Sequence, residues 1–145
     1  MNFLCVAGRL SSLPVCVDLE LVGFADTLVG FRDALDWAER QHGTGFGLPP
    51  KTFASTWHTS LDEAPDRERP EATAWVAGAV QAVARHVNPL SQRPFYNLPV
   101  DVGEVQVDRV APEELARTVE PGWLVQGSVW VLGRLPGLEL PSDAP

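Results

Sequence analysis

Apolar and polar residues alternate with a period of two along several stretches of the chain, which is typical of strands with one buried face. The clearest case is residues 15–23, where Asp18 and Glu20 fall between apolar positions. Strands are also predicted over five further segments: residues 2–10, 53–61, 94–102, 103–110 and 124–135. Because a short Ser-Ser-Leu-Pro turn joins residues 2–10 to 15–23, these two strands are expected to form an N-terminal hairpin.

A period near 3.6 replaces the strand alternation after the second strand and predicts one amphipathic helix. Its apolar stripe consists of Phe24, Leu28, Phe31, Leu35 and Ala38. Asp26 is a suitable N-cap, and Arg40 followed by Gly43 marks the end of the helix. A second, shorter helix is predicted over residues 112–119, where Pro112 precedes two acidic residues in the first turn.

Residues 71–87 fit two different structures. Read as a helix, the segment follows Pro70 and has a continuous apolar stripe: Ala72, Trp75, Val76, Ala79, Val80, Val83, Ala84 and Val87. Read as a strand, the segment alternates only weakly and is interrupted by Gly78. Periodicity alone therefore favours the helix.

The length of 145 residues suits one domain with its own core. Four parts are expected along it: two strands, a helix and a short strand over residues 1–61, a polar loop over 62–70, a β-rich part over 71–135, and a tail over 136–145.

The stretch from Gly78 to Leu135 carries an ordered set of turn, apolar and small residues. They are Asn88, Pro89, Leu90, Ser91, Pro94, Phe95, Val110, Ala111, Pro112, Leu115, Pro121, Gly122, Val125, Gly127, Trp130, Gly133 and Arg134. This pattern resembles a segment of uncharacterised bacterial proteins, in an arrangement similar to the first four strands and the helix of an OB-type barrel. The resemblance implies an α+β fold class, namely a small OB-like β-barrel with an N-terminal β-hairpin and an amphipathic helix. It also implies that residues 76–87 are a strand, with Gly78 at a bend.

The two ends of the chain repeat one motif. Residues 5–10 are Cys-Val-Ala-Gly-Arg-Leu, and residues 130–135 are Trp-Val-Leu-Gly-Arg-Leu. The first and last strands of a small barrel each need a partner along one edge, so these two strands are predicted to lie side by side. Chance recurrence in a chain rich in valine and arginine is the alternative.

The chain is acidic, with a formal net charge of −8 from 19 acidic and 11 basic side chains, and the basic residues are scattered. Such a surface repels phosphate backbones, which disfavours nucleic acid as a partner and favours a basic protein surface. No apolar run is long enough for a membrane helix, and no secretory signal precedes Cys5. We expect a cytoplasmic protein with reduced thiols; a disulfide between Cys5 and Cys16 is the alternative.

The chain contains no complete motif for catalysis, nucleotide binding or metal binding. Residues 45–52 approach a phosphate-binding loop, but Pro50 stands before Lys51 where a backbone N–H is needed. The histidines show no metal-ligand spacing: His42, His58 and His86. His58 lies among hydroxyl residues without an orienting carboxylate, and the paired carboxylates are expected to be solvated. We expect no cofactor and no bound metal.

Exposed aromatic and charged residues are the best candidates for a contact surface. Aromatic side chains anchor protein interfaces or stack on bases. Phe95 and Tyr96 are neighbours in a predicted strand, so they must point to opposite sides of it. The predicted partner-binding residues are Asp33, Asp36, Arg93, Tyr96, Trp130 and Arg134.

These patterns predict a non-catalytic binding protein whose partner is another protein. An acidic helix face would dock a basic partner, as in small inhibitor proteins. One alternative is an OB-like protein that binds single-stranded nucleic acid, and a second is an enzyme whose site is assembled from distant residues. A homodimer paired through strand edges is compatible with all three.

Overall fold

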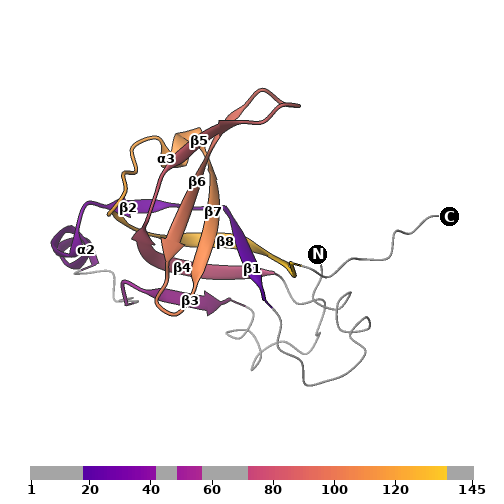
Figure 1. Cartoon of the computed structure of the whole chain (residues 1–145). Helices are drawn as coiled ribbons and strands as arrows, with labels where there is room; N and C mark the ends of the chain where they lie inside the picture. Colours follow the sequence, from indigo (N-terminus) through magenta and orange to yellow (C-terminus); the bar gives the residue numbers. More distant parts are fainter. Residues whose placement is uncertain (1–17, 42–48, 57–71, 137–145) are drawn as a thin grey trace, which may run out of the picture.

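The computed structural model describes residues 18–41, 49–56 and 72–136, and in this part the chain is mostly strand (Figure 1). The strands are β1 (Glu20–Ala25), β2 (Val29–Phe31), β3 (Thr52–Ser55), β4 (Thr73–Val80), β5 (Ala84–Val87), β6 (Pro94–Asp101), β7 (Gln106–Pro112) and β8 (Leu124–Arg134). The helices are α2 (Ala34–Gln41) and α3 (Glu113–Ala116). The described strands all belong to one mixed sheet.

Five of the strands pair in a closed ring. Around the ring, β4 pairs with β6, β6 with β7, β7 with β1, β1 with β8, and β8 again with β4. Every pairing is antiparallel except that of β1 with β7, which are parallel and place Phe24 opposite Val110. The other strands attach outside the ring, β2 to β8, β3 to β4 and β5 to β6. The pairing therefore covers both edges of each ring strand over part of its length.

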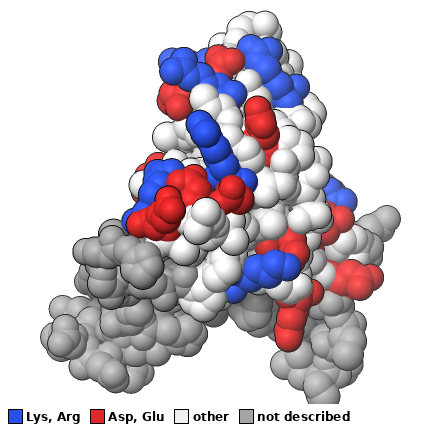
Figure 2. All heavy atoms as spheres, turned by 90° about the vertical axis from the view of Figure 1, so that its left-hand side faces the viewer, with Lys and Arg blue, Asp and Glu red and all other residues white. Residues whose placement is uncertain are grey.

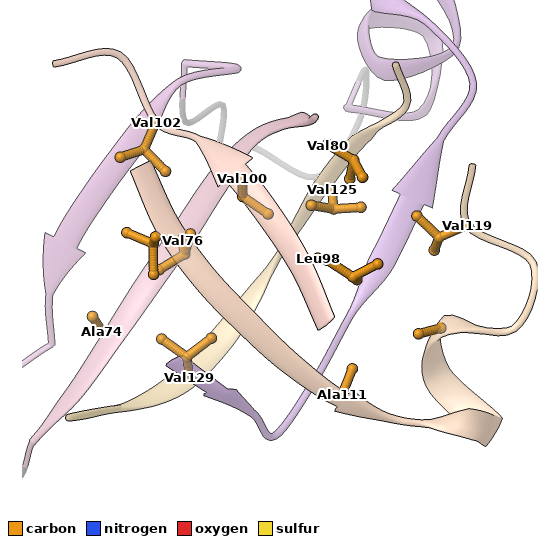
Figure 3. Packing of buried hydrophobic residues seen from close by; sticks show 12 residues of the cluster. Ala74, Val76, Val80, Leu98, Val100, Val102, Ala111, Val119, Val125 and Val129 are labelled. Carbon is orange, nitrogen blue, oxygen red and sulfur yellow. The ribbon is translucent and has the colours of Figure 1, made fainter. Parts of the chain in front are cut away.

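The core fills the inside of the ring and consists mainly of valine and other small apolar side chains (Figure 3). Val76 of β4, Leu98 and Val100 of β6, Val107 of β7 and Val125 of β8 are fully buried. Side chains in a strand point alternately to opposite faces, so these residues fix which face is inside. Burying each of them fully is worth about 1.5–3 kcal/mol.

A second, smaller cluster lies between α2 and the outside of the ring. It is formed by Phe31 of β2, Trp37 of α2 and Ala77 of β4. The rings of Phe31 and Trp37 have centroids 4.7 Å apart, and the guanidinium of Arg40 lies 4.6 Å from the Phe31 centroid. The helix is therefore held by a few aromatic contacts and covers part of the outer face of β4.

The helix predicted from Phe24 to Ala38 is wrong in its first half. Phe24 lies in β1, Phe31 lies in β2, and the helix begins only after Asp33. Asp33 is the residue that caps it, because its Oδ1 accepts the N–H groups of Leu35 and Asp36 at 2.9 and 2.8 Å. Spacings of four and three residues fit a strand–turn–strand as well as a helix, and pairing with β8 decides between them.

The predicted apolar stripe of this helix is also wrong. Leu35 is 68% exposed, whereas Trp37 is the buried residue of α2. The reason is that β2 and α2 pack on each other through Phe31 and Trp37, a contact that no continuous helix could make.

Most described residues of the segment 71–87 form strands rather than a helix, so the helix that periodicity favoured is wrong and the strand alternative is confirmed, as two strands rather than one. Residues 73–80 are β4 and residues 84–87 are β5. The strand β4 is buried or half-buried at every position, because the core lies on one face, Phe31 and Trp37 pack against Ala77 on the other, and neighbouring strands pair along both edges. A strand buried on both faces shows no polar alternation, which is why its sequence imitates a helix.

The other predicted elements are confirmed in the described residues, with shifted ends. They correspond to β1, β3, β6, β7, α3 and β8. The last strand pairs with β1, which places Glu20 opposite Arg134. The strand predicted over residues 2–10, its hairpin, and its pairing with the last strand lie outside the described residues, as do the loop 62–70 and the end of the tail.

Gly78 lies where the partner along one edge of β4 changes from β3 to β6. Residues 74–77 pair with β3, and Ala79 and Val80 pair with β6, while β8 pairs with the opposite edge up to Ala79. A Cβ atom on Gly78 would lie against the carbonyl of Asp101 and 2.7 Å from Cγ1 of Val100. The close approach of two backbones therefore requires glycine here.

Replacing this glycine should destabilise the fold. We expect Gly78→Ala to lower the free energy of unfolding by about 3 kcal/mol, because the carbonyl it meets belongs to the backbone and cannot rotate away. Urea unfolding followed by tryptophan fluorescence measures this. Gly133→Ala is the matched control, because its Cβ would meet only the flexible end of Leu19 at 3.2 Å. Equal stability of the two variants would contradict the conclusion that the close approach of two backbones requires glycine at position 78.

Candidate functional site

An exposed pair of aromatic side chains lies on the outer surface of the ring. Phe24 of β1 is opposite Trp130 of β8, and their ring centroids are 6.4 Å apart at an interplanar angle of 45°. Phe24 is 41% exposed and Trp130 is 55% exposed, although side chains of this size are usually buried. We define the outer aromatic face as Phe24, Trp130 and their register neighbours Val110 and Thr73.

The strand pleat places this face on the outside of the ring. Val129 is buried in the core, so Trp130, its neighbour in the strand, points outward. Gly23 likewise faces inward, where an added Cβ would lie 3.1 Å from Cβ of Val129. Because β1 is paired with β7 on one edge and β8 on the other, the backbone beneath Phe24 is held on both sides.

Charged and hydroxyl groups border the outer aromatic face along β8. Arg134 Nε lies 3.2 Å from Oε2 of Glu20 at one end. Toward the other end, the Ser128 hydroxyl donates to Oδ2 of Asp26 at 3.2 Å, and the Ser128 N–H donates to Oγ1 of Thr27 at 2.9 Å. A serine that contacts a carboxylate and a hydroxyl is not activated as a nucleophile by this arrangement, so the groups serve to fix the β1–β2 turn on β8.

A buried arginine lies beneath that turn, and the sequence patterns did not single it out. Arg109 of β7 is completely buried. Its Nη2 donates to the carbonyl oxygen of Thr27 at 2.5 Å and its Nη1 to that of Val76 at 3.5 Å, while Nε has no partner among the described residues. Burial lowers the pKa of Arg109 to about 10, so the side chain remains cationic at neutral pH.

The backbone of β8 makes room for this guanidinium at Gly127. A Cβ there would lie against the Thr27 carbonyl and 2.8 Å from Nη2 of Arg109, and the φ angle of Gly127 is +151°. One signal in the sequence could have located the buried arginine. Arg109 stands between Val107 and Ala111 at alternate positions, and both of those neighbours face the core.

The predicted contact residues fall in three separate places. Trp130 and Arg134 lie on β8, Asp33 and Asp36 lie at the start of α2, and the remaining two belong to the β5–β6 hairpin. The structure therefore joins Trp130 with Phe24, which was not predicted as a partner-binding residue, rather than with the acidic helix face.

The two predicted aspartates are engaged in local interactions. Asp33 caps α2 through its Oδ1. Oδ2 of Asp36 accepts the backbone N–H of Arg32 at 2.9 Å and lies 3.6 Å from Nη1 of Arg40. A partner that used these carboxylates would have to compete with the contacts that start the helix.

The hairpin residues differ in their surroundings. Tyr96 is half-buried and packs against the core, whereas Phe95 points outward and stacks on His86 with centroids 5.3 Å apart. This confirms that Phe95 and Tyr96 point to opposite sides. Arg93 is exposed and follows the turn, whereas Tyr96 keeps only part of its side chain at the surface.

The glycine- and proline-rich loop does not form a phosphate cradle in its described part. Nζ of Lys51 lies 2.6 Å from Oδ2 of Asp101, and the Thr52 hydroxyl donates to the carbonyl of Pro49 at 3.0 Å. The hydrogen bond from Lys51, and then that from the Gly103 N–H, lower the pKa of Asp101. Lys51 thus links the start of β3 to β6, while Thr52 closes a local turn with Pro49.

Charges of opposite sign are interleaved on the surface. On the side of the molecule that carries α2, blue and red atoms lie beside one another rather than in separate patches (Figure 2). Lys51, Arg40, Arg85 and Arg134 each form an ion pair with a carboxylate. The described surface therefore offers no extended cationic track for a phosphate backbone.

No family model matches this chain, and no match to it is found among curated proteins or solved structures. In the described ranges, no helix is both long enough and apolar enough to cross a membrane. The same ranges hold no group of three or more histidine, cysteine, aspartate or glutamate side chains placed to bind a metal ion.

A lysine in place of Arg109 should make stability depend on pH. The same burial lowers the pKa of a lysine below its ordinary value in the unfolded chain. At a pH between the folded and unfolded pKa values the unfolded state binds more protons, so the stability of Arg109→Lys rises from neutral pH toward pH 9. The wild type shows no such slope from Arg109, since that group stays protonated over this range. Urea unfolding across the range tests this, with exposed Arg117→Lys as the control; parallel curves would contradict it.

The cap of α2 gives a second test. Asp33→Ala removes the acceptor for two N–H groups and should cost about 1 kcal/mol of stability. Glu39→Ala, on an exposed position of the same helix, should change stability by less than about 0.5 kcal/mol. Thermal unfolding monitored by circular dichroism compares the two, and an equal loss would show that Asp33 is not the cap.

Proposed function

We propose that this protein is a non-catalytic binding protein that docks another protein on the outer aromatic face. The observation that carries the proposal is the exposed Phe24–Trp130 pair, which stands on a wall of the ring rather than on a loop. Tryptophan is among the residues that most often dominate the binding energy of protein interfaces. A partner that covered both rings would remove this apolar surface from water.

The charge distribution supports a protein as the partner. The chain has a net charge of −8, and Arg134, the cation nearest the outer aromatic face along β8, is already paired with Glu20. A surface with an apolar centre and basic side chains around it would complement this face. A phosphate backbone would meet repulsion instead.

We also propose that the ring is an OB-like barrel whose fifth strand comes from the N-terminal side. The resemblance runs from the end of β4 through β5, β6, β7 and α3 to β8. Its first strand would be β4 with β5, and the next three would be β6, β7 and β8. OB-type barrels have five strands. Here β1 lies between β7 and β8 and completes a ring of five, which supports the proposal.

Binding of single-stranded nucleic acid is the second candidate function, and one observation favours it. OB-type barrels bind oligonucleotides on the face of their second and third strands, which would be β6 and β7 here. Phe95 on β6 stacks on His86 at the surface and offers a ring on which a base could stack. Asp108, on the outer side of β7, has the wrong charge for a phosphate, so this candidate ranks second.

Truncating the outer aromatic face should abolish partner binding. Partners would first be captured on the full chain from a lysate of its own cells after nuclease treatment, and then purified. We expect the double variant Phe24→Ala, Trp130→Ala to raise the Kd at least about thirtyfold, because two anchoring rings are lost. Isothermal titration calorimetry measures the change. Phe53→Ala, an exposed aromatic truncation on β3, should leave the Kd unchanged.

Two results would overturn the proposal. One is an unchanged Kd for the double variant when its urea unfolding matches that of the wild type. The other is binding of single-stranded oligonucleotides that weakens steeply with salt and is lost in Phe95→Ala, which would support the second candidate.

A further inference from the structure

The β5–β6 hairpin projects from the ring (Figure 1). The strand β5 pairs only with β6, from Ala84 opposite Asn97 to Val87 opposite Pro94, and all four of its residues are exposed. The strand β5 therefore contributes little to the core, whereas β6 continues into it.

The turn at the end of this hairpin is fixed by its own hydrogen bonds. Oδ1 of Asn88 accepts the N–H groups of Leu90 and Ser91 at 2.9 and 3.1 Å, and the Asn88 carbonyl accepts that of Gln92 at 2.8 Å. The Asn88 N–H donates to the carbonyl of Arg93 at 2.9 Å, which closes the turn. Gln92 has a φ angle of 56° and donates from Nε2 to the carbonyl of Pro89 at 2.8 Å. The backbone is thus ordered before any partner arrives.

A leucine stands at the tip of this ordered turn. The side chain of Leu90 is 95% exposed, more than any other large apolar side chain in the described residues. Its N–H is bound by Asn88, but its side chain is left in water. At 95% exposure the side chain buries almost no apolar surface in the fold, so it contributes little to stability.

We propose that this hairpin is a preformed docking element whose Leu90 inserts into an apolar pocket of a protein partner with a carboxylate at the pocket rim. An ordered turn loses little conformational entropy on binding, so less of the free energy gained by burying one anchoring side chain is offset by ordering the backbone. Pockets that take a single anchor are the usual centre of such interfaces.

The charges of the hairpin indicate which group should border the apolar pocket of the partner. Arg85 Nε lies 3.3 Å from Oε1 of Glu113, so its charge is already compensated within the chain. Arg93 is exposed and forms no ion pair with the described residues. A carboxylate on the partner, close to the bound leucine, would complement Arg93.

A membrane is a less favourable binding partner for Leu90 than a protein. One leucine side chain buries far less apolar area than a myristoyl chain, and a single myristoyl chain gives only marginal membrane binding. The net charge of −8 also opposes approach to an anionic bilayer. Insertion of Leu90 into lipid would therefore contradict the proposal.

This inference rests on the proposed function in that the partner is a protein, but it uses a different surface from the outer aromatic face. The first step is to place a photoreactive amino acid at position 90 of the full chain, or at position 35 as a control. Leu35 is also an exposed leucine, but it lies on α2. After irradiation in a lysate of the chain's own cells, we expect a protein adduct at position 90 and none at position 35.

The captured protein is then purified and titrated with variants of the full chain. We expect Leu90→Ala and Arg93→Gln to raise the Kd, the former at least about tenfold, while Leu35→Ala and Arg117→Gln leave it unchanged. Asn88→Ala keeps the leucine but frees the turn, so it should also raise the Kd while the urea unfolding midpoint stays near that of the wild type.

Each contrary outcome overturns the inference. These outcomes are the lack of a protein adduct at position 90, a lipid adduct in its place, or an adduct protein whose Kd does not respond to Leu90→Ala. The double variant Phe24→Ala, Trp130→Ala separates the two surfaces. If only the double variant weakens binding, the outer aromatic face is the binding surface and the hairpin proposal is wrong. If only Leu90→Ala weakens binding, the hairpin is the binding surface and the proposal for the outer aromatic face is wrong.

Discussion

The guanidinium of Arg109 inside the ring is the interaction on which the surrounding structure depends. A buried cation without a carboxylate partner needs other acceptors, and here they are the carbonyl groups of Thr27 and Val76. Thr27 belongs to the β1–β2 turn and Val76 to β4, so one side chain from β7 ties together segments across the ring. Gly127 lacks a side chain because the Thr27 carbonyl and the guanidinium occupy that space. The charge thus constrains both the turn and the path of β8.

Both proposed binding surfaces are carried by backbone that hydrogen bonds hold in place. The strand β8 is paired with β4, β1 and β2 along its length, so Trp130 is presented from a backbone that does not rearrange. The backbone of the turn at Leu90 is also ordered, but by local hydrogen bonds rather than by strand pairing. Both surfaces expose apolar atoms on an ordered frame, which reduces the entropy lost when a partner binds. Ion pairs lie elsewhere on the described surface, at Arg40, Lys51 and Arg85.

Much of the fold could be predicted from the sequence, because strand alternation involves only neighbours along the chain. The strands β6, β7 and β8 were located in this way, and so was the short helix α3. Trp130 was identified as a candidate contact residue because it is one of the aromatic residues of the β-rich part, and Arg93 because it lies near Tyr96 in the predicted sheet. Prediction failed at β4, whose two faces are both covered, and at Phe24, whose spacing to Phe31 suits a helix equally well.

The sequence by itself determined the β-rich class, the acidic surface and most strand positions, since these follow from composition and local periodicity. Only the tertiary structure decided that β1 lies between β7 and β8, that Phe24 meets Trp130, and that Arg109 is buried. These contacts join residues far apart in the chain, and each depends on which strand edge is left open after the others have paired. That choice is made by the packing of the whole ring, and no local pattern contains it.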